Sequence, residues 1–515
     1  MKKNPFVSHL LWHFSKKGKS KTLLIVSASA LALASCSEGA DCDERFNGGV
    51  NNTQLENPAA QNVKFSTVVN SDGSENVLCE WPTVYGASGF ETEVFNVDDP
   101  ANPIIVSEKD TIDGNSFTFK KAEDTNYQVN IRVLGNITYN NKDAAEATRI
   151  AYSSMIPAQI IPAGTEISSF IASHIVETGD EQAFELESGE YECNSEIDFQ
   201  DKKVTLRGNK VNHSVVKFGK DGVIRTSAGM KVKWINFDCA EQGNKGGVIE
   251  MSVNPPASAS AEAQGIAAGK NSNKPADVYV LMAPIIIQDC AFKDVNVALF
   301  SVGECSWGIA DLRIDNCVVQ LKNDGSQWSD GSVLSGYSKG FKAPSGGQFW
   351  YGGIKSITVK NSTFVNTVEN KKNNRFIRFN NKDLDRVFPT PDGSATFENN
   401  TFYKTFANKE FGNNTPNRKE YTITFNNNIC YDIFRLQKFI QGNCTNVVNQ
   451  ATNSICGVSN KVDATDKGKW ATEEPDMSFA GPCEQSLDFS KPSFGVNFKA
   501  TSALSSTIGD PRWRE

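Results

Sequence analysis

The most constraining feature of this chain is a short motif that recurs through its second half. In each copy, apolar and polar side chains alternate, a pair rich in Asn or Asp follows, and an apolar residue comes next. Successive copies, at Cys239, Phe292, Val319, Phe364, Phe402 and Cys430, are 53, 27, 45, 38 and 28 residues apart. A repeat of 27 residues, lengthened in some copies by inserted loops, explains this spacing.

Such a repeat predicts a parallel β-helix, in which each coil stacks on the coil before it. Inward positions of one coil lie over those of the next, so Phe, Ile, Val and Cys recur. Asn suits the tight bend, because it tolerates the left-handed conformation and its amide can hydrogen bond from coil to coil. We therefore expect Cys239, Cys290 and Cys317 to be small buried residues rather than disulfides or metal ligands.

A different β pattern precedes the repeats. Short runs at 77–81, 90–95, 116–119 and 127–133 alternate with period 2 and are separated by polar turns. They resemble a fibronectin type III sandwich, with Trp81 as the core tryptophan and Tyr127 as the tyrosine near a strand corner. The resemblance implies a spacer, with direct glycan binding as the alternative.

Residues 165–175 connect the two β regions and have the spacing of a helix. Thr165 is the expected N-cap, and Phe170 and His174 lie on the same face as the apolar residues. We interpret His174 as a structural residue of this helix rather than as a catalyst.

The N-terminus has the charge layout of an export signal. Residues 1–35 hold six lysines and no acid, and the apolar run 22–34 is shorter than the ~20 residues of a membrane-spanning helix. The run ends in Leu33-Ala34-Ser35-Cys36, which resembles a lipobox and implies lipidation at Cys36. A plain signal peptide with a chance cysteine is the alternative.

The residues after Cys36 are acidic, with Glu38, Asp41, Asp43 and Glu44 in close succession. This patch resembles the surface-export signal of outer-membrane lipoproteins in glycan-harvesting Gram-negative bacteria. It implies a lipid-anchored protein on the cell surface. A solvated acidic tether is the alternative.

The sequence therefore predicts an all-β protein, a fibronectin type III-like β-sandwich followed by a right-handed parallel β-helix. Its expected segments are a lipoprotein signal peptide at 1–36, a flexible tether at 37–62, the sandwich at 63–160, a connector with a capping helix at 161–182, and the β-helix at 183–515.

Three stretches resemble known β-helix proteins. Residues 184–191 and 203–209 are similar to the opening coils of the pectate lyase superfamily, and Gly509-Asp510-Pro511-Arg512-Trp513 is similar to the end of β-helix lipoproteins from polysaccharide-utilisation loci. The resemblance covers about residues 175–515 and implies a pectin lyase-like solenoid. It also implies a pectin-like acidic polysaccharide as ligand and outer-membrane glycan-uptake proteins as partners.

The charge distribution points to the same ligand class. The formal net charge is −8, which argues against nucleic-acid binding as the main function. Without residues 1–35 the chain carries 46 basic and 60 acidic residues, a net charge of −14. Residues 339–386 nevertheless hold ten basic and three acidic residues, a local balance of +7. We interpret this basic stretch as a candidate site for a uronan.

Within the basic stretch, Arg375 and Arg378 are the best candidates. They are three residues apart, so they share one face only if the strand bends or contains a bulge. The full set of expected ligand-binding residues is Arg375, Arg378, Lys371, Lys372, Lys382, Arg386, Trp350 and Tyr351. The alternative is that the basic side chains simply point outward from strands and that the rings pack beneath a loop.

Catalysis on this scaffold would need further groups. The repeats contain no Asp-Asp pair, which disfavours polygalacturonase-type hydrolysis. A Ca²⁺-dependent lyase needs a base, for which Arg375, Arg378 and Lys382 are candidates, and metal ligands, for which Asp383 and Asp385 are candidates.

Three functions follow in order of preference. The first is a surface lipoprotein that captures an acidic polysaccharide, the second is a pectate-type lyase, and the third is a structural or adhesive surface protein. The sequence identifies neither the sugar nor any disulfide among Cys444, Cys456 and Cys483.

Overall fold

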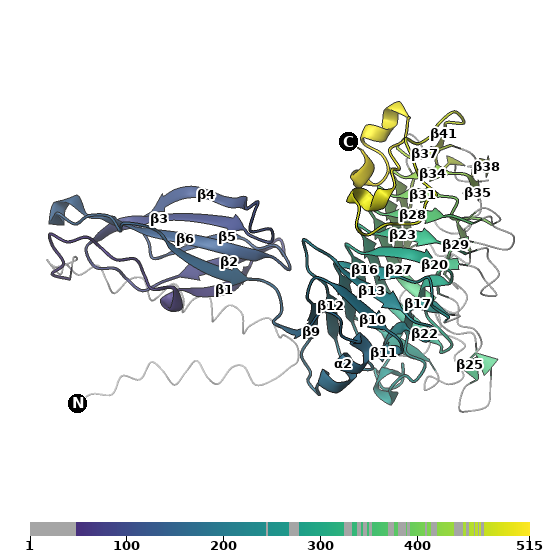
Figure 1. The fold of residues 1–515 in the computed structure, drawn as a ribbon, viewed down its shortest axis with the longest axis horizontal. Coiled ribbons are helices and arrows are strands. Elements are labelled where there is room, and N and C mark those ends of the chain that lie inside the picture. Colours follow the sequence, from purple (N-terminus) through teal and green to yellow (C-terminus); the bar gives the residue numbers. More distant parts are fainter. Residues whose placement is uncertain are drawn as a thin grey trace, which may run out of the picture. The chain divides into compact units, whose positions relative to one another are not determined.

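The structure is a computed structural model that divides the chain into two compact units, residues 1–154 and 155–515 (Figure 1). It describes residues 48–514 except 244–245, 267–277, 324–331, 337–340, 343–347, 350–352, 369–374, 380–387, 389–391, 407–408, 414–419, 437–445, 450–452, 458, 462 and 465–467. No helix in these described ranges is long and apolar enough to cross a membrane.

The first unit is a β-sandwich of two antiparallel sheets. One sheet has the order β1-β2-β5, with bounds Lys64–Val69, Glu75–Glu80 and Ser116–Lys120. The other has the order β4-β3-β6-β7, with bounds Ile104–Ile112, Ala87–Asn96, Asn126–Gly135 and Thr148–Ser153. Alternate residues of both sheets meet in a core with the buried Trp81. The Tyr127 hydroxyl accepts a hydrogen bond from the Ala122 backbone N–H at 2.7 Å.

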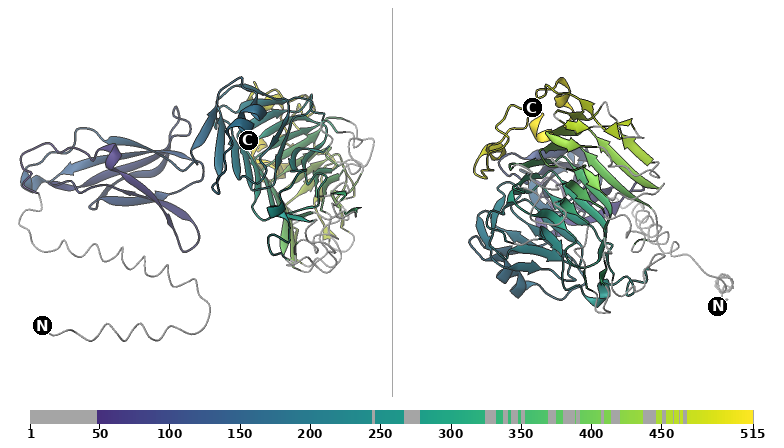
Figure 2. Two further views of the ribbon diagram at one scale, coloured as in Figure 1. Left: turned by 90° about the horizontal axis from the view of Figure 1, so that it is seen from below. Right: turned by 90° about the vertical axis from the view of Figure 1, so that its right-hand side faces the viewer.

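The second unit is a parallel β-helix whose coils stack along three sheets, here called sheets I, II and III (Figure 2). Together with the sandwich, these sheets confirm the predicted all-β fold class. A coil passes from sheet I to sheet II, then to sheet III and back to sheet I. Most of the core consists of inward side chains from these strands.

The bounds of the strands are as follows. Sheet I contains β8 (Ala158–Ile161), β9 (Gln182–Leu186), β12 (Val204–Arg207), β15 (Met230–Lys233), β19 (Ile285–Gln288), β22 (Trp307–Asp315), β27 (Gly353–Lys360), β30 (Gly393–Glu398), β33 (Tyr421–Asn426) and β36 (Asn446–Asn449), with β18 (Tyr279–Leu281) paired to β22. Sheet II contains β10 (Glu190–Cys193), β13 (Ser214–Phe218), β16 (Ile235–Asp238), β20 (Ala291–Val295), β23 (Val318–Leu321), β28 (Thr363–Asn366), β31 (Thr401–Tyr403), β34 (Ile429–Tyr431), β37 (Ile455–Cys456) and β41 (Thr472–Glu473). Sheet III contains β11 (Glu196–Asp198), β14 (Val223–Thr226), β17 (Gly247–Met251), β21 (Ala298–Ser301), β24 (Ser332–Ser335), β29 (Arg375–Arg378) and β32 (Gly412–Asn413). Three short pairs lie outside these sheets: β25 (Phe341–Lys342) with β26 (Gln348–Phe349), β35 (Ile433–Arg435) with β38 (Ser459–Lys461), and β39 (Asp463–Ala464) with β40 (Gly468–Lys469).

Inward aromatic residues form a stack through the coils. The rings of Phe218, Phe237 and Phe292 lie 5.5 and 4.9 Å apart in consecutive coils and are nearly parallel. Burying one such ring contributes roughly 1.5–3 kcal/mol. The apolar residue of each repeat therefore stabilises the coil above and the coil below it.

The bend from sheet I to sheet II repeats in successive coils. Its first residue has a left-handed backbone, with φ of 53° at Asp289 and 54° at Asn427 and similar values at the intervening bends, Asn316, Asn361 and Asn399. Its second residue points inward and hydrogen bonds to the preceding coil, as where the Asn428 side chain accepts the Asn400 N–H at 3.0 Å. The predicted role of Asn at the bend is confirmed.

The cysteines of the repeats are buried in this core. Cys239, Cys290 and Cys317 are at most 3% exposed, and no described cysteine forms a disulfide. Burial raises the pKa of Cys290 to about 12, which makes its thiol a poor nucleophile. Cys456 is buried, Cys483 is a partly buried free thiol, and Cys444 lies outside the described residues.

Helix α2 (Ile167–His174) covers the first coil and begins one residue later than the sequence suggests. Its N-cap is Glu166, whose carboxylate accepts the Ser169 N–H at 2.8 Å and the Asn194 N–H at 3.0 Å. Thr165 is not the cap, because its hydroxyl donates to the Pro162 carbonyl oxygen. The His174 ring stacks on Phe170 at 4.0 Å, a structural contact within the helix.

A segment that we call the clasp, residues 478–514, returns along the outer face of sheet II (Figure 1). It contains the short 3₁₀ turns η6 (Pro492–Gly495), η7 (Ala503–Ser506) and η8 (Pro511–Trp513). Trp513 is 6% exposed, and its Nε1 donates to Thr363 Oγ1 at 2.7 Å. Asp510 is fully buried and accepts a hydrogen bond from the same hydroxyl at 2.8 Å. The clasp therefore covers apolar positions of sheet II that would otherwise face solvent.

Candidate functional site

Strand β29 carries the two arginines that the sequence singles out, and both face outward. Strict alternation would place Phe376 and Ile377 on opposite faces, but both are fully buried in the core. Their N–H groups both donate to the Phe411 carbonyl oxygen, at 3.1 and 3.0 Å. Two residues opposite one partner make a β-bulge, and this bulge brings Arg375 and Arg378 to the same outer face of sheet III.

A glutamate and a third arginine lie beside them. Arg375 Nε is 3.7 Å from Glu410 Oε1, and Arg435 Nη2 is 3.4 Å from Glu410 Oε2. The strand register places Arg378 between Ser335 and Asn413. We call Arg375, Arg378, Glu410 and Arg435 the arginine cluster.

The cluster is partly withdrawn from solvent. The side chains of Arg375, Glu410 and Arg435 are 14%, 9% and 24% exposed. These four side chains comprise three guanidinium groups and one carboxylate, a formal balance of +2 among themselves. Charges in such partly buried positions are screened less by salt than charges on an open surface. The arrangement is suited to accept further anionic groups.

The other end of sheet III has the opposite sign. Arg225 donates to Glu250 Oε2 from Nη2 at 2.9 Å and from Nε at 3.0 Å, and it also contacts Glu196. Asp198 accepts the Ser252 hydroxyl at 2.8 Å. This end holds three carboxylates and one guanidinium. The outer face of sheet III therefore changes from acidic to basic along the axis of the β-helix.

Most of the other predicted site residues fall outside the described residues. These are the lipidation candidate Cys36, the binding candidates Trp350, Tyr351, Lys371, Lys372, Lys382 and Arg386, and the calcium candidates Asp383 and Asp385. Within the described ranges, no group of three or more His, Cys, Asp and Glu side chains could hold a metal ion. The calcium site stays a prediction.

Sequence reasoning missed two members of the cluster. Glu410 and Arg435 lie outside the basic stretch, and neither belongs to the repeated motif. They meet Arg375 because consecutive coils align in register: Glu410 pairs with Arg435, and Phe411 N–H donates to the Arg435 carbonyl oxygen at 3.2 Å. An exact alignment of the coils would have been needed to find them.

Two family models match parts of the chain, and each is described as a domain of unknown function. DUF4992 matches residues 12–199 and DUF4957 matches residues 189–331, so neither covers half of the chain. No curated protein matches the chain.

Several solved pectate lyases resemble the chain at 10% identity. Pectate lyase PelI from Erwinia chrysanthemi in complex with tetragalacturonic acid has a TM-score of 0.17, covering 70% of this chain and 87% of that one. The structure of PelI described without that ligand has a TM-score of 0.18, with coverages of 67% and 86%. Pectate lyase Pel3 from Pectobacterium carotovorum has a TM-score of 0.18, with coverages of 70% and 89%. Similarity at this level bears on neither substrate nor catalysis.

Proposed function

We propose that this protein captures an acidic polysaccharide of the pectic type on the outer face of sheet III. The observation that carries this proposal is the arginine cluster, in which a bulge brings two arginines to one face beside a third. The lipidated Cys36 would hold the protein on the outer membrane, and the sandwich would act as a spacer. Outer-membrane glycan-uptake proteins would receive the captured chain.

The charge pattern supports binding of a chain rather than of a single ion. The strands of sheet III stack from coil to coil along the axis of the β-helix, about 4.8 Å apart. Their outward side chains therefore form columns that run parallel to this axis. A polyuronate lying along this face would meet guanidinium groups at β29 and beyond. The acidic end at β11–β17 would repel it. Arginine is suited to this role because its planar guanidinium binds carboxylates in a bidentate way.

Affinity electrophoresis in gels containing polygalacturonate tests the proposal. Neutralising one arginine, in Arg375→Gln or Arg378→Gln, should weaken retention by about tenfold, which corresponds to about 1.4 kcal/mol. Arg313→Gln is the matched control, because Arg313 is a 53% exposed arginine on sheet I. Retention that is equal in all three variants would refute the arginine cluster as the binding site.

Glu410 offers a test in the opposite direction. Its carboxylate lies next to Arg375 and Arg435 and competes with a ligand carboxylate for them. Glu410→Gln raises the cluster charge from +2 to +3 and should strengthen retention on polygalacturonate at low salt. The gain should shrink as salt is added, because salt screens the added attraction. Weaker retention of folded Glu410→Gln protein would contradict a purely electrostatic role for the cluster.

The same samples also test the lyase alternative. A lyase would release unsaturated uronates, which absorb in the ultraviolet, when Ca²⁺ is added to polygalacturonate. Binding without this product supports capture. Product formation that disappears on chelation of Ca²⁺ would establish the lyase instead.

A further inference from the structure

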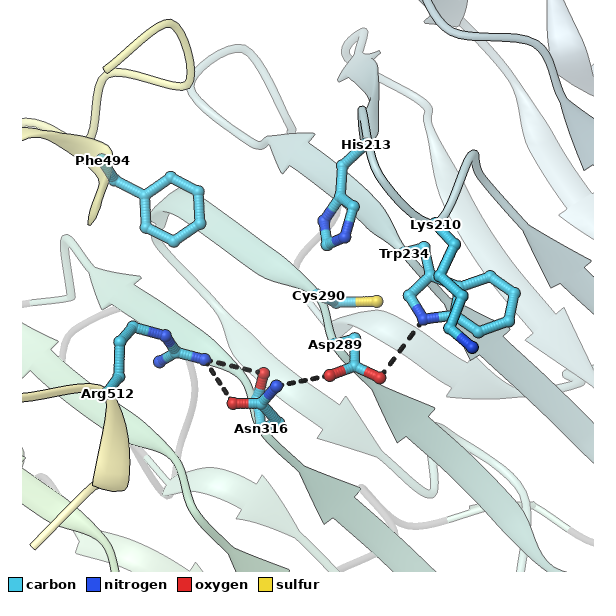
Figure 3. A pocket seen from close by; sticks show the side chains of 8 residues that line it. All are labelled: Lys210, His213, Trp234, Asp289, Cys290, Asn316, Phe494 and Arg512. Atoms are coloured by element: carbon cyan, nitrogen blue, oxygen red, sulfur yellow. Dashed lines mark hydrogen bonds between the residues drawn. The ribbon is translucent and has the colours of Figure 1, made fainter. Parts of the chain in front are cut away.

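A cavity lies on another part of the β-helix, at the bend between sheets I and II (Figure 3). Its volume is about 320 Å³. The wall comes from three consecutive bends at Trp234, Asp289 and Asn316, and the clasp contributes Phe494 and Arg512. None of these residues belongs to the arginine cluster, so the cavity, here called the corner pocket, is a separate site.

One side of the corner pocket is a chain of hydrogen bonds. Arg512 Nη2 donates to Asn316 Oδ1 at 2.6 Å, and Asn316 Nδ2 donates to Asp289 Oδ1. Trp234 Nε1 donates to the other oxygen of Asp289 at 3.3 Å. Lys210 Nζ lies 5.2 Å from the centre of the Trp234 ring. These contacts place the donor groups of Lys210 and Arg512 and the acceptor carboxylate of Asp289 along one wall.

The rings of Phe494 and His213 lie on the other side (Figure 3). Burial lowers the pKa of His213, although the nearby Asp289 opposes the shift. His213 is therefore a neutral ring at neutral pH, and Phe494 adds an apolar face. The pocket thus has one polar wall and one wall of rings.

Two aromatic residues hold strained backbones to build this pocket. Trp234 has φ of 57° where the following bends carry Asp or Asn, and Phe494 has φ of 59°. Bulky residues rarely adopt this left-handed conformation, and it costs roughly 1–3 kcal/mol for each residue. Asn at position 234 would make the same bend without that cost. The tryptophan at this bend lines the pocket, where its Nε1 donates to Asp289.

The charges around the pocket cancel. The lining holds two cations, Lys210 and Arg512, and one carboxylate, Asp289. Arg512 Nη1 is paired outside the lining with the buried Asp510, 2.8 Å from Oδ2, which leaves Lys210 and Asp289 to balance each other. A pocket without net charge offers an anion no advantage, whereas adjacent donors and acceptors suit hydroxyl groups. The volume is at the low end of the ~300–1,000 Å³ of small-molecule sites, which limits the ligand to about one ring.

We propose that the corner pocket binds a single neutral sugar residue. The apolar face of the sugar ring rests against Phe494. Its hydroxyl groups donate to Asp289 and accept from Lys210 and Arg512. The protein then has two carbohydrate sites of different chemistry, one for an acidic chain on sheet III and one for a neutral sugar at the bend.

Calorimetric titration of the full chain with D-galactose, D-xylose, L-arabinose and D-galacturonate tests this assignment. At least one neutral sugar should bind, and more tightly than galacturonate. Phe494→Ala and Asp289→Asn should each weaken that binding by about tenfold. Asp289→Asn keeps the bend intact because Asn holds this position in the following coils. Lys220→Ala, at an exposed lysine outside the pocket, is the control.

Three results would overturn the assignment. They are absence of binding by all three neutral sugars, tighter binding of galacturonate, and unchanged neutral-sugar binding in both pocket variants. Retention on polygalacturonate is measured in parallel with the same variants. This retention should not change in Phe494→Ala. The two measurements can therefore contradict the sugar site in the corner pocket and the uronan site at the arginine cluster separately.

Discussion

At the bend between sheets I and II, neighbouring residues of the same type do different work. Asn427 has φ of 54° and is half-buried, so its contribution is conformational. Asn428 is fully buried. Its Nδ2 donates to the Phe397 carbonyl oxygen at 2.9 Å, and its Oδ1 accepts the Asn400 N–H at 3.0 Å. The sequence shows both as Asn, and only the direction of the side chain separates them.

Substitution at these two positions should therefore have unequal effects. Asn428→Ala removes two buried hydrogen bonds, one to the Phe397 carbonyl oxygen and one from the Asn400 N–H, which should reduce the free energy of unfolding by about 2–4 kcal/mol. Asn427→Gly keeps the left-handed backbone and should cost only a few tenths of a kcal/mol. Chemical denaturation of both variants measures the difference. Equal destabilisation would show that the inward amide is not what holds the coils together.

The cap of α2 provides a pH-dependent contact. Burial disfavours the Glu166 carboxylate, but hydrogen bonds from Ser168, Ser169 and Asn194 outweigh it and lower the pKa to about 2. Because the folded pKa is depressed from 4.5, the stabilisation is complete above pH 4.5 and is lost as the pH falls through 2.

Removing this cap tests the sign of the effect. Glu166→Ala should destabilise the second unit by about 1 kcal/mol at neutral pH, as expected for a lost N-cap. The difference from the wild type should diminish as the pH falls below 4.5. Thermal unfolding across that range measures it. A difference that stays constant down to pH 2 would rule out the carboxylate as the cap.

At the scale of elements, the clasp holds distant parts of the chain together. Asp510 contacts Thr363, and Arg512 contacts Asn316, across 147 and 196 residues. Gly509, with φ of 86°, approaches so closely that an added Cβ would lie 2.6 Å from Ile429 Cδ1. The motif Gly509–Trp513 therefore has a packing role.

Loss of the central ring should release the clasp. Trp513→Ala removes a buried ring and the hydrogen bond to Thr363, at a cost of about 3–5 kcal/mol. Hydrogen exchange of the backbone amides should then increase in residues 478–514 and in β28. Leu504→Ala is the control, because Leu504 is 41% exposed in the same segment. Unchanged exchange in Trp513→Ala would show that other contacts hold the clasp.

At the scale of the whole molecule, the two units have separate hydrophobic cores. The core around Trp81 and Tyr127 contains residues of the sandwich alone, and the core of the β-helix contains residues of the second unit alone. Chains of this kind depart from a single two-state transition. We therefore expect the two units to respond to core substitutions independently.

Calorimetry of two variants of the full chain tests this independence. Trp81→Ala should destabilise the sandwich by about 3–5 kcal/mol, lowering its melting temperature by about 10 °C or more. Phe364→Ala should move only the transition of the β-helix. A single transition that shifts equally in both variants would mean that the units unfold together.

The repeated motif made most of the β-helix predictable. Apolar positions recur because each coil covers the next, and Asn399 or Asn427 marks a bend because few residue types accept its backbone. The candidate site was harder to predict from the sequence. Local charge singles out Arg375 and Arg378 as candidates, but their neighbours Glu410 and Arg435 required the register of coils. The corner pocket required the clasp, whose contacts cross more than a hundred residues and leave no periodic trace.

The position of the clasp also sets an order of events during synthesis. Residues 509–514 follow every coil they bind, so they leave the ribosome after those coils have emerged. Until the clasp is complete, Ala291, Val318 and Val365 lack the cover that Leu487, Val496, Phe498 and Trp513 provide. A chain that ended before the clasp should therefore expose an apolar strip on sheet II, which is covered only when Trp513 reaches Thr363.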